Sequence, residues 1–427
     1  MRLSIPPLIV ALLATLAVGA VVGCDGFTTP VGFNPPAGGG GGGGGGVVEP
    51  PVPDIDFAGV DEYLTIDPHS PDNYVSVAYP PHYDANVLNR DNTPGDNPVT
   101  NAGATLGRVL FYDRRLSIND TIACATCHQQ AIGFTDTAQF SLGFNGVDVT
   151  GAHTPRINNV KFYTPGEFFW DRRAPTLEFQ STQPIQSPVE MGWDEAAGGM
   201  PALIEKMETL PYYPELFHWV FGDEQITEAR MQHAMAQFMR SMVSINSRFD
   251  SGFAAVYNPT APGAGVGAPF PNFTQQENRG KQLFFGGPGG GGPGGPGGPG
   301  GPGGGGGGVG CGGCHQAPTM SLAGNSRSNG LDMGETIIFK SPSLKNVGVT
   351  GPYMHDGRFN TLAEVVEFYN SGVQNGPALD NRLKTPQGQP RRLNLTEDDK
   401  AALVAFMLTL TDNTLSNDAR FSDPFVK

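Results

Sequence analysis

The chain is 427 residues long, which is enough for two or three domains with ordinary buried cores. It carries 26 Lys and Arg residues against 41 Asp and Glu residues, and its formal net charge at pH 7 is −15. This balance argues against nucleic acid as a partner, because binding to phosphates requires clustered Lys and Arg side chains.

The N-terminus has the pattern of an export signal. Arg2 supplies positive charge, and the apolar run from Leu8 to Val22 is short for a membrane span. The run leads into Val-Val-Gly-Cys, a pattern similar to a bacterial lipoprotein signal, in which the cysteine is lipidated and becomes the mature N-terminus. We therefore expect residues 1–24 to be a signal peptide and the protein to be periplasmic, anchored to a membrane through a lipid on Cys24. The alternative is an ordinary secretory signal with an incidental cysteine.

Two tracts rich in Gly and Pro interrupt the chain. The first, residues 25–56, includes unbroken glycines from Gly38 to Gly46, and the second spans residues 286–308. Such segments cannot bury enough apolar surface to offset the entropy of ordering. The first tract is predicted to be a flexible tether and the second a disordered surface insertion.

Apolar periodicity elsewhere predicts helices and almost no alternating strands, so the expected fold class is mainly α. Residues 227–243 form a clear helix, and 361–369 and 396–410 form two more. Thr274 with Glu277, and Thr361 with Glu364, are typical of capping boxes at helix starts. The apolar face of the first helix is expected to be core rather than a source of metal ligands, and consists of Met231, Ala234, Met235, Phe238, Met239 and Met242.

The strongest chemical signal is a repeated pentapeptide, Cys-x-x-Cys-His. It is the attachment signature of c-type haem, in which both thiols bond to the haem vinyl groups and the histidine can ligate the iron. A zinc site made of the four thiolates would leave both histidines without a role. The two copies consist of Cys124, Cys127 and His128, and of Cys311, Cys314 and His315.

Each haem motif follows a similar lead-in, in which Leu and Phe stand at the same offsets after Gly107 or Gly280. A helix with Gly on one face can approach another helix closely, which suits the small cytochrome c fold. We therefore predict two cytochrome c-like haem domains packed together, at residues 57–265 and 266–427, with few or no strands. The cofactors are two covalently bound haems.

Five segments of the chain resemble the bacterial di-haem cytochrome c peroxidases, and more closely the MauG-like branch of that family. The similarity covers residues 86–410, apart from the second Gly/Pro tract. The matching segments are LFYDRRLS at 110–117, FWDRR at 169–173, QPIQSPVEM at 183–191, PSLKNV at 342–347 and PYMHDG at 352–357.

The resemblance implies that hydrogen peroxide reacts at the N-terminal haem, with electrons passed through the C-terminal haem. Glu190 matches the catalytic acid–base Glu, Gln180 the distal Gln, and Trp170 the tryptophan that relays electrons between the haems. The implied redox partner is an electron-donor cytochrome, a cupredoxin or a protein substrate. A solvated acid, a surface amide and a core Trp are the alternative interpretations of these three residues.

The position fourteen residues after His355 carries the axial ligand of the C-terminal iron in this family, and here it is Tyr369. MauG-like members have Tyr at this position, whereas peroxidases that take electrons from small cytochromes have Met. Tyrosinate should depress the reduction potential relative to Met. A core Tyr is the alternative, with Met354 or Met333 as the ligand.

Three departures from the family pattern have consequences. No histidine stands between His128 and His153, so the N-terminal iron is expected to be open, and Arg172 stands where Gly is frequent. The resemblance also implies a calcium ion bound by the carbonyls of Thr350 and Pro352. His153 weighs against this ion, because it replaces the usual Asn ligand and imidazole is a poor ligand for calcium.

The leading functional hypothesis is therefore a di-haem c-type peroxidase that reduces hydrogen peroxide. The alternative within the family is MauG-like oxidation of residues on a partner protein. A hypothesis of a different class is a di-haem electron-transfer cytochrome without peroxidase activity, which would have both irons six-coordinate and unreactive to peroxide.

Overall fold

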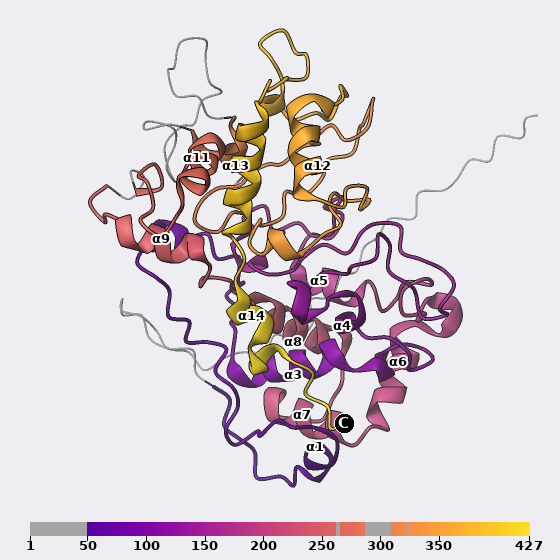
Figure 1. Cartoon of the computed structure of the whole chain (residues 1–427). Coiled ribbons are helices and arrows are strands. Elements are labelled where there is room, and N and C mark those ends of the chain that lie inside the picture. The colour runs from indigo at the N-terminus through magenta and orange to yellow at the C-terminus, as the bar shows by residue number, and fades with distance from the viewer. Residues whose placement is uncertain (1–48, 262–264, 287–308, 323) are drawn as a thin grey trace, which may run out of the picture. The chain divides into compact units, whose positions relative to one another are not determined.

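The structure, a computed structural model, describes residues 49–261, 265–286, 309–322 and 324–427 (Figure 1). All of them belong to one compact unit, residues 47–427. The predicted signal peptide with Cys24, most of the predicted tether and nearly all of the second Gly/Pro tract lie outside the described residues. None of the helices in the described ranges combines the length and the apolar character that a membrane span requires.

Helices joined by long loops make up the described residues, which contain isolated β-bridges but no strand. The prediction of a mainly α fold with few or no strands is confirmed. The α-helices are α1 (Ala58–Tyr63), α2 (Ala85–Leu88), α3 (Asn101–Tyr112), α4 (Cys124–Cys127), α5 (Leu177–Thr182), α6 (Gly199–Glu208), α7 (Tyr212–Phe221), α8 (Glu228–Ser241), α9 (Arg248–Val256), α11 (Gln275–Phe285), α12 (Leu362–Glu367), α13 (Glu397–Leu408) and α14 (Asn413–Asn417).

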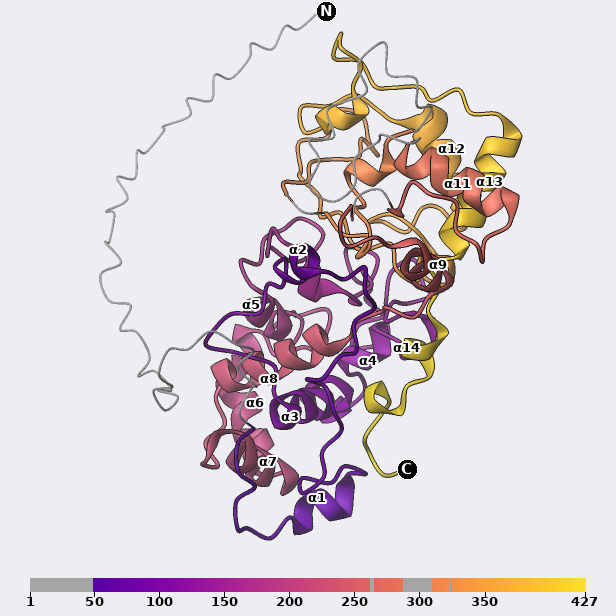
Figure 2. The same ribbon diagram turned by 90° about the vertical axis from the view of Figure 1, so that its left-hand side faces the viewer.

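Two helix pairs, α3 with α8 and α11 with α13, repeat the same crossing, and each pair lies side by side in Figures 1 and 2. A Cβ atom on Gly107 would collide with the carbonyl oxygen of Ala234, and one on Gly280 would collide with that of Ala402. Glycine is therefore required at both crossings, because only a residue without a side chain lets the backbones come this close.

The predicted helix starts are confirmed by their caps. Capping boxes form at Thr274 with Glu277 and at Thr361 with Glu364. Thr227 caps α8, and the methionines on the apolar face of this helix are buried, as expected of core residues. The helix predicted over 361–369 departs from its prediction, because α12 ends at Glu367 and the chain continues as a π-helical turn, Phe368–Gly372.

Two hydrophobic clusters form around the two helix pairs, and the chain passes from one cluster to the other at α9 and again near its C-terminus. Phe249 and Phe253 of α9 pack in the cluster of α11 and α13, whereas Leu415 and Phe421 near the C-terminus pack in the cluster of α3 and α8. The hydroxyl of Tyr112 in α3 donates a hydrogen bond of 2.5 Å to the carbonyl of Phe421. The C-terminal segment therefore ties the second half of the chain to the first.

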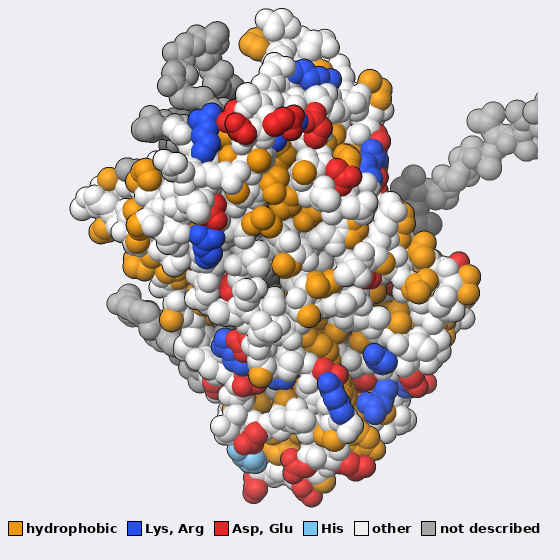
Figure 3. Space-filling model, viewed as in Figure 1, with side chains coloured by type: hydrophobic (Ala, Val, Ile, Leu, Met, Phe, Trp, Pro, Cys, Tyr) orange, Lys and Arg blue, Asp and Glu red, His pale blue; other side chains and the backbone are white. Residues whose placement is uncertain are grey.

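Charged side chains of both signs are scattered over the face shown in Figure 3, and the Lys and Arg side chains there do not gather into one large patch. A phosphate backbone would find no continuous basic surface on this face.

Candidate functional site

The first haem motif occupies α4, a single helical turn. The Thr126 hydroxyl accepts a hydrogen bond of 3.0 Å from the Ala123 amide and fixes the start of this turn. The Nδ1 atom of His128 lies 3.0 Å from the carbonyl oxygen of Phe134. A carbonyl can only accept a hydrogen bond, so Nδ1 carries the proton and Nε2 remains available to a metal.

Glu190 lies close to this motif. Burial chiefly raises the pKa of the Cys124 and Cys127 thiols, and the charge of Glu190 is near enough to contribute in both cases. Burial also raises the pKa of Glu190 itself, against the lowering effects of Ser187 and Arg173. A carboxyl group that retains its proton to higher pH is suited to exchanging protons at neutral pH.

The backbone N–H and C=O groups of Glu190 both make hydrogen bonds that hold its loop in place. The Glu190 amide donates a hydrogen bond of 3.2 Å to the Ser187 hydroxyl. The Glu190 carbonyl accepts a hydrogen bond of 2.9 Å from the amide of Phe144. Gln180 lies in α5 and is half-buried, and its side-chain amide makes no hydrogen bond to the described residues. No hydrogen bond among those residues joins Gln180 to Glu190, so their cooperation stays a prediction.

The second haem motif opens into a cavity, which we call the C-terminal cavity. Cys311, Cys314 and His315 line it, and so do Tyr369 and Trp170. Burial lowers the pKa of His315 to about 4, with Arg156 adding to the effect, so the imidazole is neutral as a metal ligand must be.

Two cations that the sequence had not singled out, Arg156 and Lys340, also line the C-terminal cavity. Burial lowers the pKa of Arg156 to about 10 and that of Lys340 to about 7, and no carboxylate of the described residues compensates either group. Unpaired cations in such surroundings are costly unless an anion joins them. The two propionates of a haem match them in number and charge, so the residues present fit the cofactor that the motif predicts.

Tyr369 is carried into the C-terminal cavity by the π-helical turn that follows α12. Burial raises the pKa of its phenol above the usual range. The side-chain nitrogen of Asn329 is 3.5 Å from this phenol oxygen and 3.4 Å from the sulfur of Met354. Met354 also lines the cavity. Met333 does not, and its side chain is 73 % exposed.

Trp170 takes part in a chain of hydrogen bonds that joins the two halves of the molecule. Its indole nitrogen donates a hydrogen bond of 2.6 Å to the carbonyl of His153. The His153 amide in turn donates a hydrogen bond of 2.8 Å to the carbonyl of His355. The Trp170 carbonyl accepts a hydrogen bond of 2.7 Å from the Lys340 amide. The rings of Trp170 and His355 are 6.5 Å apart. Trp170 is thus held rigidly beside the C-terminal cavity.

The residues around the predicted calcium position, His153 among them, have protein partners for several of their polar groups. The two ring nitrogens of His153 lie within hydrogen-bond distance of the Ala138 carbonyl (3.1 Å) and the Thr135 hydroxyl (3.4 Å). The Thr350 hydroxyl accepts a hydrogen bond of 3.1 Å from the Arg156 guanidinium. The carbonyls of Thr350 and Pro352 remain the only predicted calcium donors, and calcium stays a prediction.

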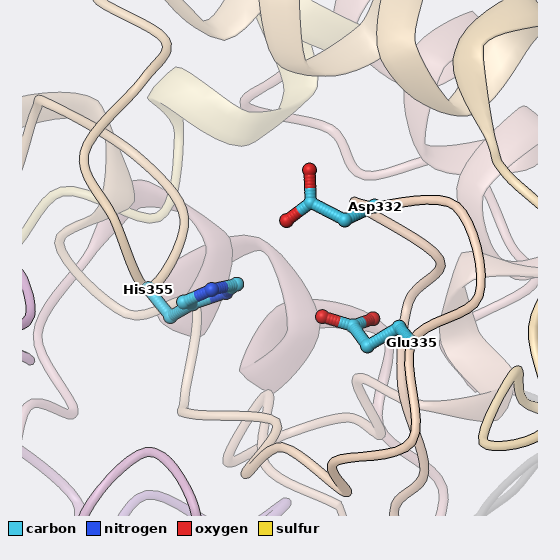
Figure 4. A group of neighbouring side chains, drawn as sticks. All are labelled: Asp332, Glu335 and His355. Carbon is cyan, nitrogen blue, oxygen red and sulfur yellow. The ribbon is translucent and has the colours of Figure 1, made fainter. Parts of the chain in front are cut away.

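A separate group of possible metal ligands lies in the second half. The side chains of Asp332, Glu335 and His355 point toward one another, and one donor atom from each lies within 4.8 Å of the others (Figure 4). The His355 ring stacks on Phe339 at 4.0 Å. Arg358 already pairs with Asp332 at 3.0 Å and offsets its charge, so we assign no metal to this group.

Comparison with known proteins gives matches throughout both halves. The family model described as di-haem cytochrome c peroxidase matches residues 101–255. The methylamine utilization protein MauG of Methylorubrum extorquens is 30% identical over 323 residues, which are 74% of this chain and 80% of that protein. The cytochrome c551 peroxidase of Nitrosomonas europaea is 29% identical over 312 residues, 72% of this chain and 79% of the relative.

A solved structure described as a MauG-like protein associated with microbial copper homeostasis has the same fold. It superposes with a TM-score of 0.60 at 28% sequence identity and covers 82% of this chain and 99% of its own. The similarity thus extends over both haem motifs and the loops between them.

Proposed function

This chain belongs to the di-haem cytochrome c peroxidase family, and from that premise we propose that Glu190 moves the proton while peroxide is reduced beside Cys124 and Cys127. The chain is a peroxidase-type oxidoreductase with two covalently attached c-type haems. When bound, these haems supply the redox chemistry by which hydrogen peroxide is reduced. The single observation that carries the proposal is a carboxyl of raised pKa close to the first haem motif.

The remaining roles are those that the family resemblance implies for residues at these positions. Glu190 takes the proton from one peroxide oxygen and delivers it to the other, which leaves as water. Gln180 holds the peroxide through its side-chain amide. Trp170 fixes the boundary between the halves, where an aromatic ring can relay electrons, and Tyr369 ligates the iron in the C-terminal cavity.

Replacing Glu190 tests the proposal. Glu190→Gln removes the exchangeable proton and preserves the shape, so the peroxide-induced spectral change in stopped-flow absorbance should slow by about 10² or more. Glu195→Gln is the matched control, because Glu195 is exposed five residues along the chain. Pyridine haemochrome titration should give two haems in both variants. An unchanged rate in Glu190→Gln would move the role to Gln180.

A second candidate is oxidation of residues on a partner protein, and Tyr369 is the observation that favours it. A tyrosinate ligand lowers the potential of the C-terminal iron and makes small cytochromes less suitable donors. Peroxide-treated protein that oxidises a reduced small cytochrome c over many turnovers supports the peroxidase. Protein that keeps its oxidised spectrum in the presence of that cytochrome supports the second candidate.

Export to the periplasm and a lipid anchor on Cys24 belong to the same proposal. They rest on the signal pattern of residues 1–24. The donor cytochrome, cupredoxin or protein substrate would then be met outside the cytoplasm, and calcium at Thr350 and Pro352 stays a prediction.

A further inference from the structure

Arg172 is the departure from the family pattern that the peroxidase function leaves unexplained. Its φ is +61°, in the left-handed region that glycine adopts without cost. A long cationic side chain therefore occupies a position whose backbone would favour glycine.

Arg172 opens onto a cleft of about 500 Å³, which adjoins the C-terminal cavity and which we call the arginine cleft. Three guanidinium groups from separate segments of the chain meet there, together with one carboxylate and neutral polar side chains. The polar lining consists of Arg172, Arg327 and Arg382, with Asn325, Ser326, Asn381 and Asp380.

The charges of this lining do not cancel. Arg172 pairs with Glu167, and Arg382 pairs with Asp380 at 2.8 Å. Arg327 is exposed, makes no ion pair within the described residues, and donates a hydrogen bond of 2.9 Å to the Pro377 carbonyl. The cleft therefore keeps an uncompensated positive charge in a chain whose net charge is −15.

One polar group at the cleft also lacks a partner. The Nε atom of Arg172 is buried and makes no hydrogen bond to the described residues. Ser326 is 3 % exposed, and its hydroxyl lies beside that of Tyr163. Buried polar atoms are almost always satisfied in native proteins, so the unpartnered Nε of Arg172 favours a polar partner at this cleft.

The arginine cleft lies next to the second haem motif. Arg382 donates a hydrogen bond of 2.7 Å to the carbonyl of Gly313, between the two attachment cysteines. Arg382, Arg327 and Ser326 also line the C-terminal cavity. The arginine cleft therefore adjoins both the second haem motif and the C-terminal cavity.

We propose that the arginine cleft binds a carboxylate beside the second haem motif. Planar guanidinium groups match carboxylates through paired hydrogen bonds, and Arg327 supplies a charge that no ion pair within the described residues offsets. The carboxylate comes from a small organic acid or from an acidic side chain of a partner protein. A partner held there would stand where electrons enter this haem, a role that rests on the proposed function, whereas the binding itself does not.

Calorimetric titration of the resting holoprotein at low ionic strength tests the binding, with citrate and with tetraglutamate as the two probes. Arg172→Gly should be tolerated, since glycine suits the backbone, and Arg327→Gln removes the uncompensated charge. Each variant should weaken binding by about tenfold or more, the effect of losing a charge-assisted contact. Arg114→Gln is the matched control, because Arg114 is exposed in the first half and should leave binding unchanged.

The two probes separate the two sources of carboxylate. Binding of citrate alone identifies a small organic acid, and binding of tetraglutamate alone identifies an acidic segment of a partner. The proposal is overturned if neither probe binds, or if both arginine variants bind as the wild type does while haemochrome titration still finds two haems. No peroxide is present, so these outcomes are independent of the proposed peroxidase function.

Discussion

At the scale of the residue, the C-terminal cavity contains Tyr369, Arg156 and Lys340, none of which meets an opposite charge among the described residues. The Tyr369 side chain is half-buried, and the hydrogen-bond contact of its phenol is a long one of 3.5 Å to Asn329. Burial of a phenol without a strong partner is costly, and a metal cation can be that partner. Burial of the cationic side chains of Arg156 and Lys340 is costly as well, and an anion can offset that cost.

Substitution of Tyr369 tests its role as a ligand. Tyr369→Phe should abolish the low-spin ferric EPR signal of one haem, and Tyr369→Met should raise the potential of that haem, because a thioether stabilises the reduced iron. Tyr79→Phe is the control, since the Tyr79 hydroxyl is also buried and unpartnered but Tyr79 does not line the cavity. If the spectra of both Tyr369 variants match the wild type, Tyr369 is a core residue and Met354 becomes the candidate ligand.

At the scale of the element, two features of the helices position the site. The π-helical turn after α12 changes the register just before Tyr369, and such turns are frequent at functional sites. The glycine crossings of α3 with α8 and of α11 with α13 bring each helix pair together beside a haem motif. The π-helical turn departs from the predicted continuous helix over 361–369. The glycine crossings confirm the expected close approach of the helices.

Alanine at either crossing should destabilise the fold. Gly107→Ala and Gly280→Ala each place a methyl group against a backbone carbonyl, which cannot move aside. The overpacking cost of about 1–3 kcal/mol should exceed the gain in helix propensity of about 1 kcal/mol. Urea denaturation of the holoprotein measures the difference. Gly95→Ala is the control, because a Cβ atom there meets nothing, and equal stability of all three variants would contradict the close crossing.

At the scale of the whole molecule, the two halves are joined by the return of the C-terminal segment and by the hydrogen bonds from Trp170 through His153 to His355. These links keep the first haem motif and the C-terminal cavity in one compact unit, 47–427. Electron exchange between the halves needs such a fixed spacing.

The lipid anchor is a prediction about the whole molecule. Cys24→Ser removes the thiol that would carry the lipid, so the protein should move from the membrane fraction to the soluble fraction after mild lysis. Intact-mass analysis of the wild type should show the added acyl mass. A wild type that is already soluble and carries no acyl mass would contradict the anchor.

The sequence by itself determined the haem motifs, the helix starts and the family. The reason is that attachment of a haem to Cys124 and Cys127, or capping of α12 by Thr361 and Glu364, depends on residues within a few positions of each other. Only the tertiary structure brought Arg156 together with Lys340, or assembled the arginine cleft. Isolated cations carry no local signal of their partners, because the charges that they meet are decided by how distant segments pack.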